Sequence, residues 1–346
     1  MASNRPVVAL AMGDPAGISP ELTAKLLALE EVRNAARIVV FGDYRILEEG
    51  ALAAGQMPPV QRVKYGQSYA CADEPVFIDL EHLSPDKVLR GEATAVGGAF
   101  AIENFRHALM MAKNGKAQAV CFTPFNKQAM RYVYPGYSDE IGFVADVIGF
   151  QGIAREFNIL EGLWNARVTS HIPLSQVASS LTRESIVAEL ALADRCLREA
   201  GIEKPRIAVA AINPHAGDGG NCGDDEITVI GPAVKEAIRQ GYNASGPYPA
   251  DTVFVRARSG AFDAVLTMYH DQGQIAMKLM GFDRGVTLLG GFPFPICTPA
   301  HGTAYDIAWK GIANIGASRA AFLLAARMAA EGLAKAAGDT SSRQTS

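Results

Sequence analysis

Short apolar runs alternate with helical patterns from the start of the chain, and this alternation constrains the fold more than any other feature. The first run, residues 7–12, begins with two valines and is followed by Gly-Asp-Pro. A helix is predicted from Pro20 to residue 29. Strands that alternate with helices form a largely parallel sheet. The sequence therefore predicts an α/β fold whose ligands bind at the carboxyl ends of the strands.

The same pattern continues to the end of the chain. Further strands are predicted at residues 37–41, 60–63, 75–78, 117–121, 157–163, 167–170, 206–211 and 264–268. Further helices are predicted at residues 44–54, 94–114, 183–200, 224–240 and 318–337. No internal repeat occurs, and no G-x-G-x-x-G follows the first strand, so an ordinary dinucleotide-binding fold is not indicated.

Length and composition exclude several classes of partner. The chain has 346 residues, 49% hydrophobic and 20% charged, which is enough for two α/β lobes with a large core. A net charge of −4 without a basic run argues against nucleic acid or an anionic membrane as a partner. No segment has the roughly 18 apolar residues of a membrane-spanning helix. Five scattered cysteines without a Cys-x-x-Cys pair are typical of a reducing compartment, so we expect a cytoplasmic protein.

Histidines recur where predicted strands end, which points to a metal site. His171, His215 and His270 each follow an apolar strand. Neutral imidazoles at strand ends can bind one divalent metal even when they are far apart in the sequence. Taken singly, each is better explained as a loop histidine that caps backbone groups, but the repeated context of all three favours a metal. His82 and His107 are interpreted as surface or packing residues.

Eight short features between residue 12 and about residue 310 point to a family. They are Met12-Gly-Asp-Pro-Ala-Gly-Ile-Ser-Pro-Glu21, Thr123-Pro-Phe-Asn-Lys127, Ser170-His-Ile-Pro173, Asn213-Pro-His-Ala-Gly217, Gly223-Asp-Asp-Glu226, Tyr269-His-Asp-Gln-Gly273, Lys278 and His301-Gly-Thr303. In this order they resemble the 4-hydroxythreonine-4-phosphate dehydrogenase family of vitamin B6 biosynthesis. The resemblance implies two α/β/α lobes with a cleft between them, built like isopropylmalate dehydrogenase. It places residues 1–125 and 280–346 in a nucleotide-side lobe and residues 126–279 in a metal and dimerisation lobe.

The resemblance also implies a chemistry. The family is a homodimer with a shared active site, in which histidines at the positions of His171, His215 and His270 bind one divalent metal (Zn, Mg, Mn or Co), the last reaching in from the partner subunit. The metal would lower the pKa of the substrate alcohol, and NAD or NADP would take the hydride. The resulting ketone, β to a carboxylate, then loses carbon dioxide. Lys278 matches a substrate-contacting lysine, with a surface lysine on a helix as the alternative.

Two aspartates are further candidates for this implied metal site. Asp251 and Asp271 lie where carboxylates approach the metal, and there they would orient histidines or accept a proton. Asp271 has an alternative role as a cap of the helix that follows it.

A separate segment is the candidate nucleotide site. His301-Gly-Thr-Ala-Tyr-Asp-Ile-Ala308, which continues to Asn314, looks like the adenosine-binding loop of the β-decarboxylating dehydrogenases. The candidate cofactor contacts are His301, Gly302, Thr303 and Asp306. The alternative is a helix-entry turn capped by Thr303.

The predicted substrate pocket departs from the family pattern. The family reads Gly-His-Thr-Glu where this chain has Gly-Tyr137-Ser138-Asp, Thr287 replaces an asparagine, and an ungapped alignment puts Ile296 at a phosphate-contacting arginine. A phosphate dianion would lose its bidentate partner there, unless Arg284 or another arginine replaces it. These changes resemble the branch that includes terephthalate cis-dihydrodiol dehydrogenase. We therefore expect a non-phosphorylated cis-dihydrodiol carboxylate as substrate, with contacts from Tyr137, Ser138, Lys278, Thr287 and Ile296.

Other functions stay open at this point. The first is 4-hydroxythreonine-4-phosphate dehydrogenase activity itself, and the second is a non-catalytic nucleotide-binding regulator. The intact histidines and Lys278 argue against the regulator. A metal-dependent hydrolase or aldolase would need only the three histidines, and the 301–308 loop argues against it because hydride transfer needs the nucleotide.

Overall fold

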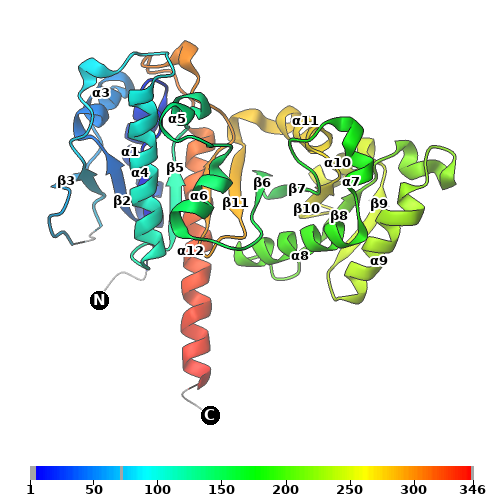
Figure 1. The fold of residues 1–346 in the computed structure, drawn as a ribbon. Helices are drawn as coiled ribbons and strands as arrows, with labels where there is room; N and C mark the ends of the chain where they lie inside the picture. The colour runs from blue at the N-terminus through cyan, green and yellow to red at the C-terminus, as the bar shows by residue number, and fades with distance from the viewer. Residues whose placement is uncertain (1–4, 71–72, 344–346) are drawn as a thin grey trace. The chain divides into compact units, whose positions relative to one another are not determined.

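The computed structural model of the protein divides into two compact units (Figure 1). It describes residues 5–70 and 73–343. Unit 1 comprises Met1–Arg155 and Val286–Ser346, and unit 2 comprises Glu156–Gly285. Each unit contains a largely parallel sheet with helices packed on it, as the alternating pattern predicts.

The unit boundaries differ from those implied by the family resemblance, which fall at 125/126 and 279/280. Helices α5 (Lys127–Val133) and α6 (Glu140–Ile148) pack against α4 (Ala95–Lys113) of unit 1. Met130 of α5 and Phe143 of α6 are buried in the core of unit 1. Residues 126–155 thus belong to unit 1 because their apolar side chains complete its core.

The strands of unit 1 follow the order β3-β4-β2-β1-β5-β12-β11. Their bounds are β1 (Val7–Ala11), β2 (Arg37–Gly42), β3 (Gln61–Lys64), β4 (Val76–Asp79), β5 (Ala119–Phe122), β11 (Val286–Gly290) and β12 (Ile296–Pro299). Neighbours are parallel except β11 and β12, which are antiparallel. The carboxyl ends of β1, β2, β4 and β5 therefore meet at one edge, where ligands of such sheets bind.

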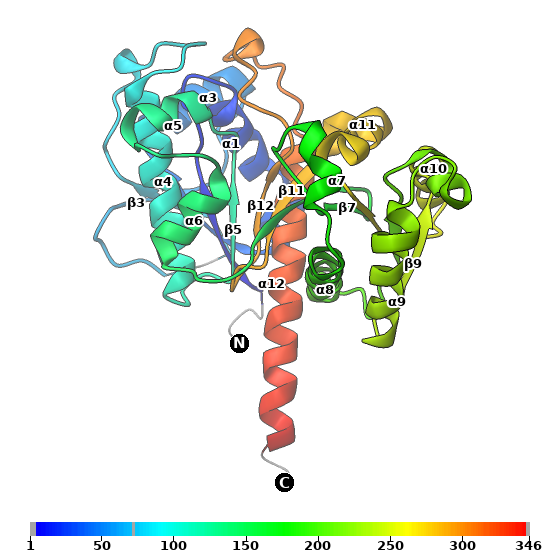
Figure 2. The ribbon, with the colours of Figure 1, turned by 45° about the vertical axis from the view of Figure 1, so that its right-hand side comes forward.

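Helices cover both faces of this sheet. Besides α4–α6, unit 1 contains α1 (Ser19–Ala28), α2 (Glu30–Ala35), α3 (Tyr44–Ala54), α12 (Gly316–Arg343), and the short η1 (Pro85–Lys87) and η6 (Tyr305–Ile307). Figures 1 and 2 show α4–α6 on one side of β5 and α12 on the other. Alternate residues of β1 point to opposite faces, so Ala9 packs towards α4 while Leu10 is buried on the other side.

The strands of unit 2 follow the order β6-β7-β10-β8-β9. Their bounds are β6 (Arg155–Leu160), β7 (Leu163–Arg167), β8 (Ile207–Ala210), β9 (Ala244–Tyr248) and β10 (Ala264–Thr267). The helices are α7 (Val177–Ser180), α8 (Arg183–Glu199), α9 (Gly231–Arg239), α10 (Ala250–Arg258) and α11 (His270–Gly281), with η2 (Leu174–Gln176), η3 (Pro214–Gly220), η4 (Glu226–Ile230) and η5 (Phe282–Arg284). Neighbouring strands are parallel except β6 and β7.

The β6–β7 hairpin corrects one sequence prediction. Residues 157–163 do not form a single strand, because Glu161 and Gly162, with φ of 48° and 91°, make a two-residue turn between Leu160 and Leu163. Positive φ at both positions is the signature of a hairpin turn that matches strand twist. As a result β7 ends at Arg167, and the strand predicted at 167–170 is absent.

The helix predicted at 224–240 is also different. A π-helical turn, η4, comes first, and α9 begins only at Gly231, with Pro232 in its first turn. Proline favours the first turn of a helix because it has no backbone N–H to leave unbonded. None of the helices in the described part of the chain is long and apolar enough to cross a membrane.

Candidate functional site

The three candidate metal ligands follow three adjacent parallel strands of unit 2. Strand β10 lies between β7 and β8. His171 follows β7, His270 follows β10 and His215 follows β8. Their three loops, residues 168–173, 211–226 and 268–273, leave the same edge of the sheet, and we call them the histidine loops.

Two of these histidines are in contact. The ring centres of His171 and His270 are 5.5 Å apart, with an angle of 42° between the ring planes. Both line a cavity of about 300 Å³, together with Tyr269, Asp271 and residues of the 169–177 segment. Two imidazoles on one zinc ion, with N–Zn distances of about 2.0–2.1 Å, have ring centres roughly 5 Å apart. The pair thus fits two ligands of a shared metal.

Asp271 orients one of the two rings. Its Oδ1 lies 2.7 Å from Nδ1 of His270. An imidazole that bonds a carboxylate through Nδ1 keeps Nε2 for a metal or a substrate. Asp271 lies in the first turn of α11, which begins at His270, so it is not the residue that precedes and caps this helix.

The metal set implied by the resemblance is incomplete in one chain. Among the residues that the structure describes, no group of three His, Cys, Asp or Glu side chains is placed to hold a metal ion. His215 and Asp251 are exposed, and neither lines the cavity of His171 and His270. His270 contacts His171 of its own chain, whereas the resemblance implies that it reaches the metal from the partner subunit.

Backbone strain marks two of the histidine loops. His171 and His215 have positive φ, 45° and 54°, and Ala216 and Asp218 do too. This left-handed conformation costs a non-glycine residue about 1–3 kcal/mol and is concentrated at functional sites. The surrounding hydrogen bonds have to hold these residues in place.

Glu226, which belongs to the 223–226 motif but is not a predicted site residue, holds the His215 loop. The side chain is buried, and its Oε1 accepts hydrogen bonds from the backbone N–H groups of Ile212 (2.9 Å) and Asn213 (2.8 Å). Its Oε2 accepts from Nδ2 of Asn213 at 3.0 Å. A Cβ atom at Gly217 would lie 2.7 Å from this Oε2, so only glycine fits there. The 213–217 and 223–226 motifs are therefore one folded loop.

Gln272 and Thr169 tie the three loops together. Nε2 of Gln272 donates to the carbonyl of Ala211 at 2.7 Å, and its Oε1 accepts from the N–H of Met268 at 2.7 Å. Oγ1 of Thr169 donates to the carbonyl of Met268, also at 2.7 Å. The side chain of Gln272 could have been singled out only from its place in the 269–273 motif.

In unit 1, the 12–21 motif packs on the 123–127 motif. Gly13 donates its N–H to Oγ1 of Thr123 (2.8 Å), and Asp14 donates to the carbonyl of Pro124 (3.0 Å). The hydroxyl of Ser19 donates to the same carbonyl at 2.7 Å. A Cβ atom at Gly13 would lie 2.3 Å from the carbonyl oxygens of Thr123 and Pro124. The close approach explains why this position is glycine.

The 12–21 motif also contacts the predicted adenosine loop. The hydroxyl of Tyr305 donates to Oδ2 of Asp14 at 2.6 Å, and the N–H of Ile18 donates to the carbonyl of Thr303 at 3.0 Å. Burial raises the pKa of Asp14, against the effect of the Tyr305 hydrogen bond. A Cβ atom at Gly17 would lie 2.6 Å from the Thr303 carbonyl oxygen. We call residues 12–21, 123–127 and 301–314 the nucleotide-side loops.

Glu21 and Lys25 fix the far end of these loops. Glu21 is 1% exposed, and its two oxygens accept from the N–H groups of Ala313 (2.8 Å) and Gly311 (3.1 Å). Nζ of Lys25 bonds Glu21 at 2.7 Å and donates to the carbonyls of Gly311 and Ala313, both at 2.9 Å. Every polar group of this clamp is satisfied, so the loop backbone is held rigidly.

The predicted cofactor contacts have different environments. Thr303 is buried, His301 is half-buried and Asp306 is exposed. No side chain caps η6, which follows Ala304, so Thr303 is not a helix cap. A Cβ atom at Gly302 would meet nothing within 4 Å, which leaves open space beside this backbone.

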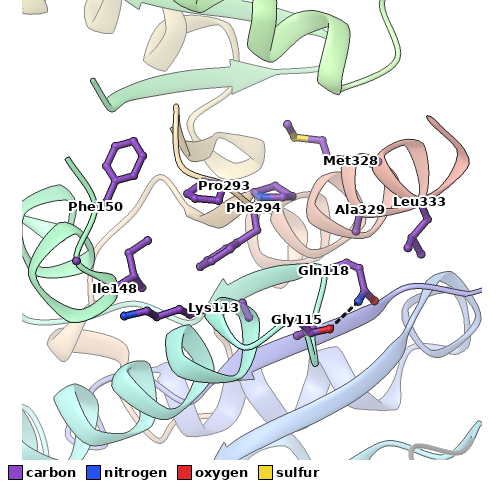
Figure 3. A pocket seen from close by; sticks show the side chains of 15 residues that line it. Lys113, Gly115, Gln118, Ile148, Phe150, Pro293, Phe294, Met328, Ala329 and Leu333 are labelled. Carbon is purple, nitrogen blue, oxygen red and sulfur yellow. Dashed lines mark hydrogen bonds between the residues drawn. The ribbon is translucent and has the colours of Figure 1, made fainter. Parts of the chain in front are cut away.

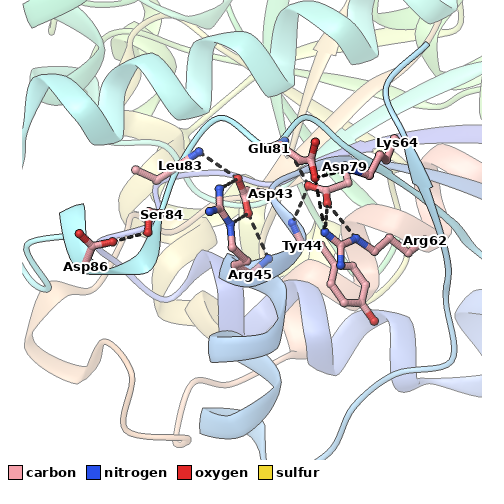
Figure 4. A network of polar contacts seen from close by, with 10 residues as sticks. All are labelled: Asp43, Tyr44, Arg45, Arg62, Lys64, Asp79, Glu81, Leu83, Ser84 and Asp86. Carbon is pink, nitrogen blue, oxygen red and sulfur yellow. Dashed lines mark hydrogen bonds and ion pairs between the residues drawn. The ribbon is translucent and has the colours of Figure 1, made fainter. Parts of the chain in front are cut away.

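A charged network supports the loops that follow β2 and β4 (Figure 4). The buried Asp79 accepts from the N–H of Tyr44 at 3.0 Å and from Nε of Arg62 at 2.8 Å. The buried Asp43 accepts from the N–H of Leu83 at 2.9 Å. The network contains none of the predicted site residues, but it fixes the start of the 80–94 loop.

Two predicted substrate contacts are core residues instead. Ile296 is completely buried in β12, in register with Leu289 and Val120. Tyr137 is 3% exposed and packs on Phe143. Neither side chain offers surface to a flat ring, so the expectation that they contact an apolar substrate is not met. An apolar side chain at position 296 is explained by the core of unit 1 alone.

The other proposed substrate residues are more accessible. Ser138 is exposed in the loop before α6, Thr287 is half-buried on β11, and Lys278 is exposed on α11. Arg284, considered as a replacement for a phosphate arginine, is in an ion pair with Glu161. Its guanidinium is therefore already engaged.

A further cavity of about 540 Å³ lies in unit 1 (Figure 3). It is lined mainly by apolar side chains of the α6 end, the segment before β12 and α12, with Lys113 and Gln118 at its polar side. It lies where α4 ends and β5 begins, opposite the carboxyl ends of the strands. No predicted site residue lines it.

Comparison with known proteins assigns the chain to a family. The model for the pyridoxal phosphate biosynthetic protein PdxA matches residues 34–325. The chain belongs to the PdxA family. A PdxA relative from Rhizobium meliloti, provisionally named 4-hydroxythreonine-4-phosphate dehydrogenase 2, is 64% identical over 94% of this chain and 94% of its own. Another, from Halalkalibacterium halodurans and provisionally named D-threonate 4-phosphate dehydrogenase, is 35% identical over 94% of this chain and 98% of its own.

Solved structures agree with membership of the PdxA family. The crystal structure of 4-hydroxythreonine-4-phosphate dehydrogenase from Klebsiella pneumoniae has a TM-score of 0.81 and 34% identity, over 95% of this chain and 99% of that one. The terephthalate 1,2-cis-dihydrodiol dehydrogenase from Burkholderia xenovorans has a TM-score of 0.62 and 27% identity, over 94% and 98%. The α/β class and the family resemblance are confirmed. Of these two structures, the dihydrodiol dehydrogenase is the less similar to this chain.

Proposed function

We propose that the chain is an NAD- or NADP-dependent dehydrogenase of a phosphorylated hydroxy acid. It oxidises a secondary alcohol, and the ketone formed β to a carboxylate then loses carbon dioxide. The observation that carries the proposal is that the family motifs fold into two loop sets at carboxyl ends of parallel strands, the usual place for ligands in α/β folds.

The substrate class follows from the relatives and from one correction. Relatives are named for 4-hydroxythreonine 4-phosphate and for D-threonate 4-phosphate, which share a four-carbon acid with a terminal phosphate. The expectation of a non-phosphorylated dihydrodiol rests on Tyr137, Thr287 and Ile296 in the pocket, and Tyr137 and Ile296 are in the core. We therefore place 4-hydroxythreonine 4-phosphate first and D-threonate 4-phosphate second.

The histidine loops supply part of a divalent metal site. His171 and His270 contribute two imidazole ligands, and a second subunit of a homodimer contributes the third, because the described part of one chain offers no set of three. A divalent metal bound there lowers the pKa of the substrate alcohol. Asp271 fixes the ring of His270. Lys278, two turns further along α11, binds the substrate carboxylate or phosphate.

The nucleotide-side loops bind the cofactor, which accepts the hydride. Gly302 leaves room for the nucleotide to approach the backbone. The half-buried His301 and the exposed Asp306 offer polar groups, whereas Thr303 holds the loop through its carbonyl. The Asp14–Tyr305 bond keeps the loop in place before the cofactor arrives.

An assay of cofactor reduction tests the proposal. The purified protein is given NAD or NADP with 4-hydroxythreonine 4-phosphate, D-threonate 4-phosphate, the dephosphorylated forms of both, or a cis-dihydrodiol carboxylate. Each is tested with Mg, Mn, Co or Zn and with a chelator. We expect metal-dependent turnover of a phosphorylated acid that the chelator abolishes. Turnover of the dihydrodiol alone would overturn the substrate, and nucleotide binding without any turnover would favour the regulator.

A further inference from the structure

Arg90 and Trp309 form a stacked pair, and neither residue is among the candidate site residues considered so far. Cζ of Arg90 is 4.4 Å from the centre of the Trp309 ring, the geometry of a cation–π contact. Arg90 belongs to the 80–94 loop, and Trp309 belongs to the 301–314 loop. Figure 1 shows these two loops, cyan and orange, beside each other at the carboxyl ends of the unit 1 strands.

Trp309 has two features that its own loop does not explain. Its backbone has a φ of 63°, a conformation that bulky side chains rarely adopt and that is concentrated at ligand sites. Its Nε1 atom is buried and has no hydrogen-bond partner among the described residues. Buried indole N–H groups are normally bonded, so this donor lacks an acceptor that a ligand would supply.

Both loops are held on fixed supports. The N–H of Gly91, next to Arg90, donates to the carbonyl of Ala16 at 2.8 Å. Gly311, two residues after Trp309, is bonded to Glu21, and a Cβ atom there would lie 2.4 Å from the carbonyl oxygen of Ala53. The pair is therefore presented by the same rigid frame as the nucleotide-side loops.

The remaining surface of Arg90 matches a nucleobase. One face of its guanidinium covers Trp309, while the side chain is 58% exposed. Its Nη2 also bonds Oε2 of Glu49 at 2.9 Å, which compensates its charge and fixes its plane. A planar, fixed and partly desolvated guanidinium stacks well on an aromatic ring. It is a poorer partner for an additional phosphate, because a carboxylate already occupies one edge.

We propose that Arg90 and Trp309 bind the adenosine half of the dinucleotide. The adenine ring stacks on the free face of Arg90, and the indole N–H of Trp309 donates to an oxygen or ring nitrogen of the adenosine. This inference rests on the proposed function, since it assumes that the 301–314 loop binds NAD or NADP. It adds a contact from the 80–94 loop, which no motif predicts.

The two tryptophans of the chain provide a direct probe. Trp164 is 1% exposed and packs on Phe157 in unit 2, so Trp164→Phe leaves Trp309 as the single emitter. This variant is titrated with NAD, with AMP and with nicotinamide mononucleotide, and Trp309 emission is followed. We expect saturable quenching by NAD and AMP and none by nicotinamide mononucleotide. Quenching by the nicotinamide half alone would overturn the inference.

Calorimetry of NAD binding to otherwise unmodified protein gives a second measurement that does not depend on Trp164→Phe. Arg90→Ala should raise the Kd by about tenfold. Arg90→Lys should weaken binding almost as much, because it keeps the charge but loses the plane, and Trp309→Phe should raise the Kd by less. Unchanged Kd values in all three variants would overturn the inference and leave the dehydrogenase standing. Absence of any nucleotide binding to the wild type would overturn both.

Discussion

The two loop sets, although both lie at carboxyl ends of parallel strands, are built in different ways. In the nucleotide-side loops of unit 1, Asp14, Glu21 and Thr303 are at most 8% exposed, and backbone groups bond them from two directions. In the histidine loops of unit 2, His171 and His215 are exposed and have strained backbones. Their supports bond neighbouring backbone rather than the histidines themselves: Glu226 accepts from Asn213, and Gln272 donates to Ala211.

This difference suits two kinds of site. The nucleotide-side loops are complete within one chain, whereas the histidine loops are not. Loops held by buried, bonded groups such as Asp14 and Glu21 keep their shape without a ligand, so unit 1 is organised in advance for the nucleotide that we propose. The exposed imidazoles of His171 and His215 are held on strained backbones, and in the proposed function a metal and a further ligand would complete their contacts. Substitutions in unit 1 should therefore cost stability, and substitutions of the histidines should cost activity.

The largest expected effect is on activity in unit 2. His171→Ala or His270→Ala should lower kcat/KM by about a thousandfold, or roughly 4 kcal/mol, by removing a metal ligand. The free energy of unfolding should change by less than about 0.5 kcal/mol, because neither side chain is in the core. Steady-state kinetics and urea denaturation measure the two quantities. An active variant that retains bound metal would remove the histidine pair from the mechanism.

Subunit mixing sharpens this prediction. If His171 and His270 bind the metal from one chain, heterodimers of His171→Ala and His270→Ala contain no intact pair and should stay inactive. Heterodimers of His171→Ala and His215→Ala should recover activity if the third ligand, His215, comes from the second subunit. Recovery in the first mixture, after confirmed subunit exchange, would instead place His171 and His270 on different subunits.

The next effect is on stability in unit 1. Gly13→Ala should lower the free energy of unfolding by about 3 kcal/mol, because its Cβ would lie 2.3 Å from two carbonyl oxygens. Gly302→Ala is the matched control, since its Cβ meets nothing within 4 Å and should cost less than about 1 kcal/mol. Equal stabilities of the two variants in urea denaturation would contradict the tight packing of the 12–21 loop.

A somewhat smaller loss is expected from the carboxylate clamp. Glu21→Gln should lower the free energy of unfolding by about 2 kcal/mol, because its amide has a single acceptor oxygen for two backbone N–H donors and no longer forms an ion pair with Lys25. Lys25→Met is the companion variant, which leaves the Glu21 carboxylate buried and without its ion pair. The prediction is contradicted if thermal unfolding of both variants matches the wild type.

The smallest effect is a pH dependence of stability in unit 1. His82 stacks on Phe100 and His107 on Phe41, and burial lowers the pKa of both imidazoles. The unfolded chain, with histidine pKa values near 6.5, then binds more protons than the folded chain. Stability should therefore be complete above about pH 6.5 and decrease as the pH falls below it.

A variant without these two histidines checks this pH effect. His82→Gln combined with His107→Phe should flatten the dependence between about pH 5 and 7, measured by urea denaturation across that range. An unchanged slope would show that other groups carry it.

Much of the fold was predictable because local sequence carries it. Helix α3, residues 44–54, was predicted with its observed bounds, since Asp43 accepts from the N–H of Arg45 at its start and Gly55 ends it with a φ of 76°. Hairpin β6–β7 was missed, because Glu161-Gly162 interrupts an otherwise continuous apolar run. Helices α5, α6 and α10 are not predicted from the sequence, whereas α11 is expected only as the alternative interpretation of Asp271 and Lys278. Helices α5 and α6 follow motifs that the sequence analysis interprets as site residues.

What the sequence by itself determined was therefore the order of strands and helices and the edge of the sheet at which the chemical residues gather. What only the tertiary structure decided was which of those residues meet. Ile296 lies in the core because β12 pairs with β5 in one register, and side chains alternate faces along a strand. Tyr305 bonds Asp14 across 291 positions of sequence, and His171 meets His270 while His215 stays apart. Periodicity acts over a few residues, whereas register and loop packing depend on segments that the chain brings together only when it folds.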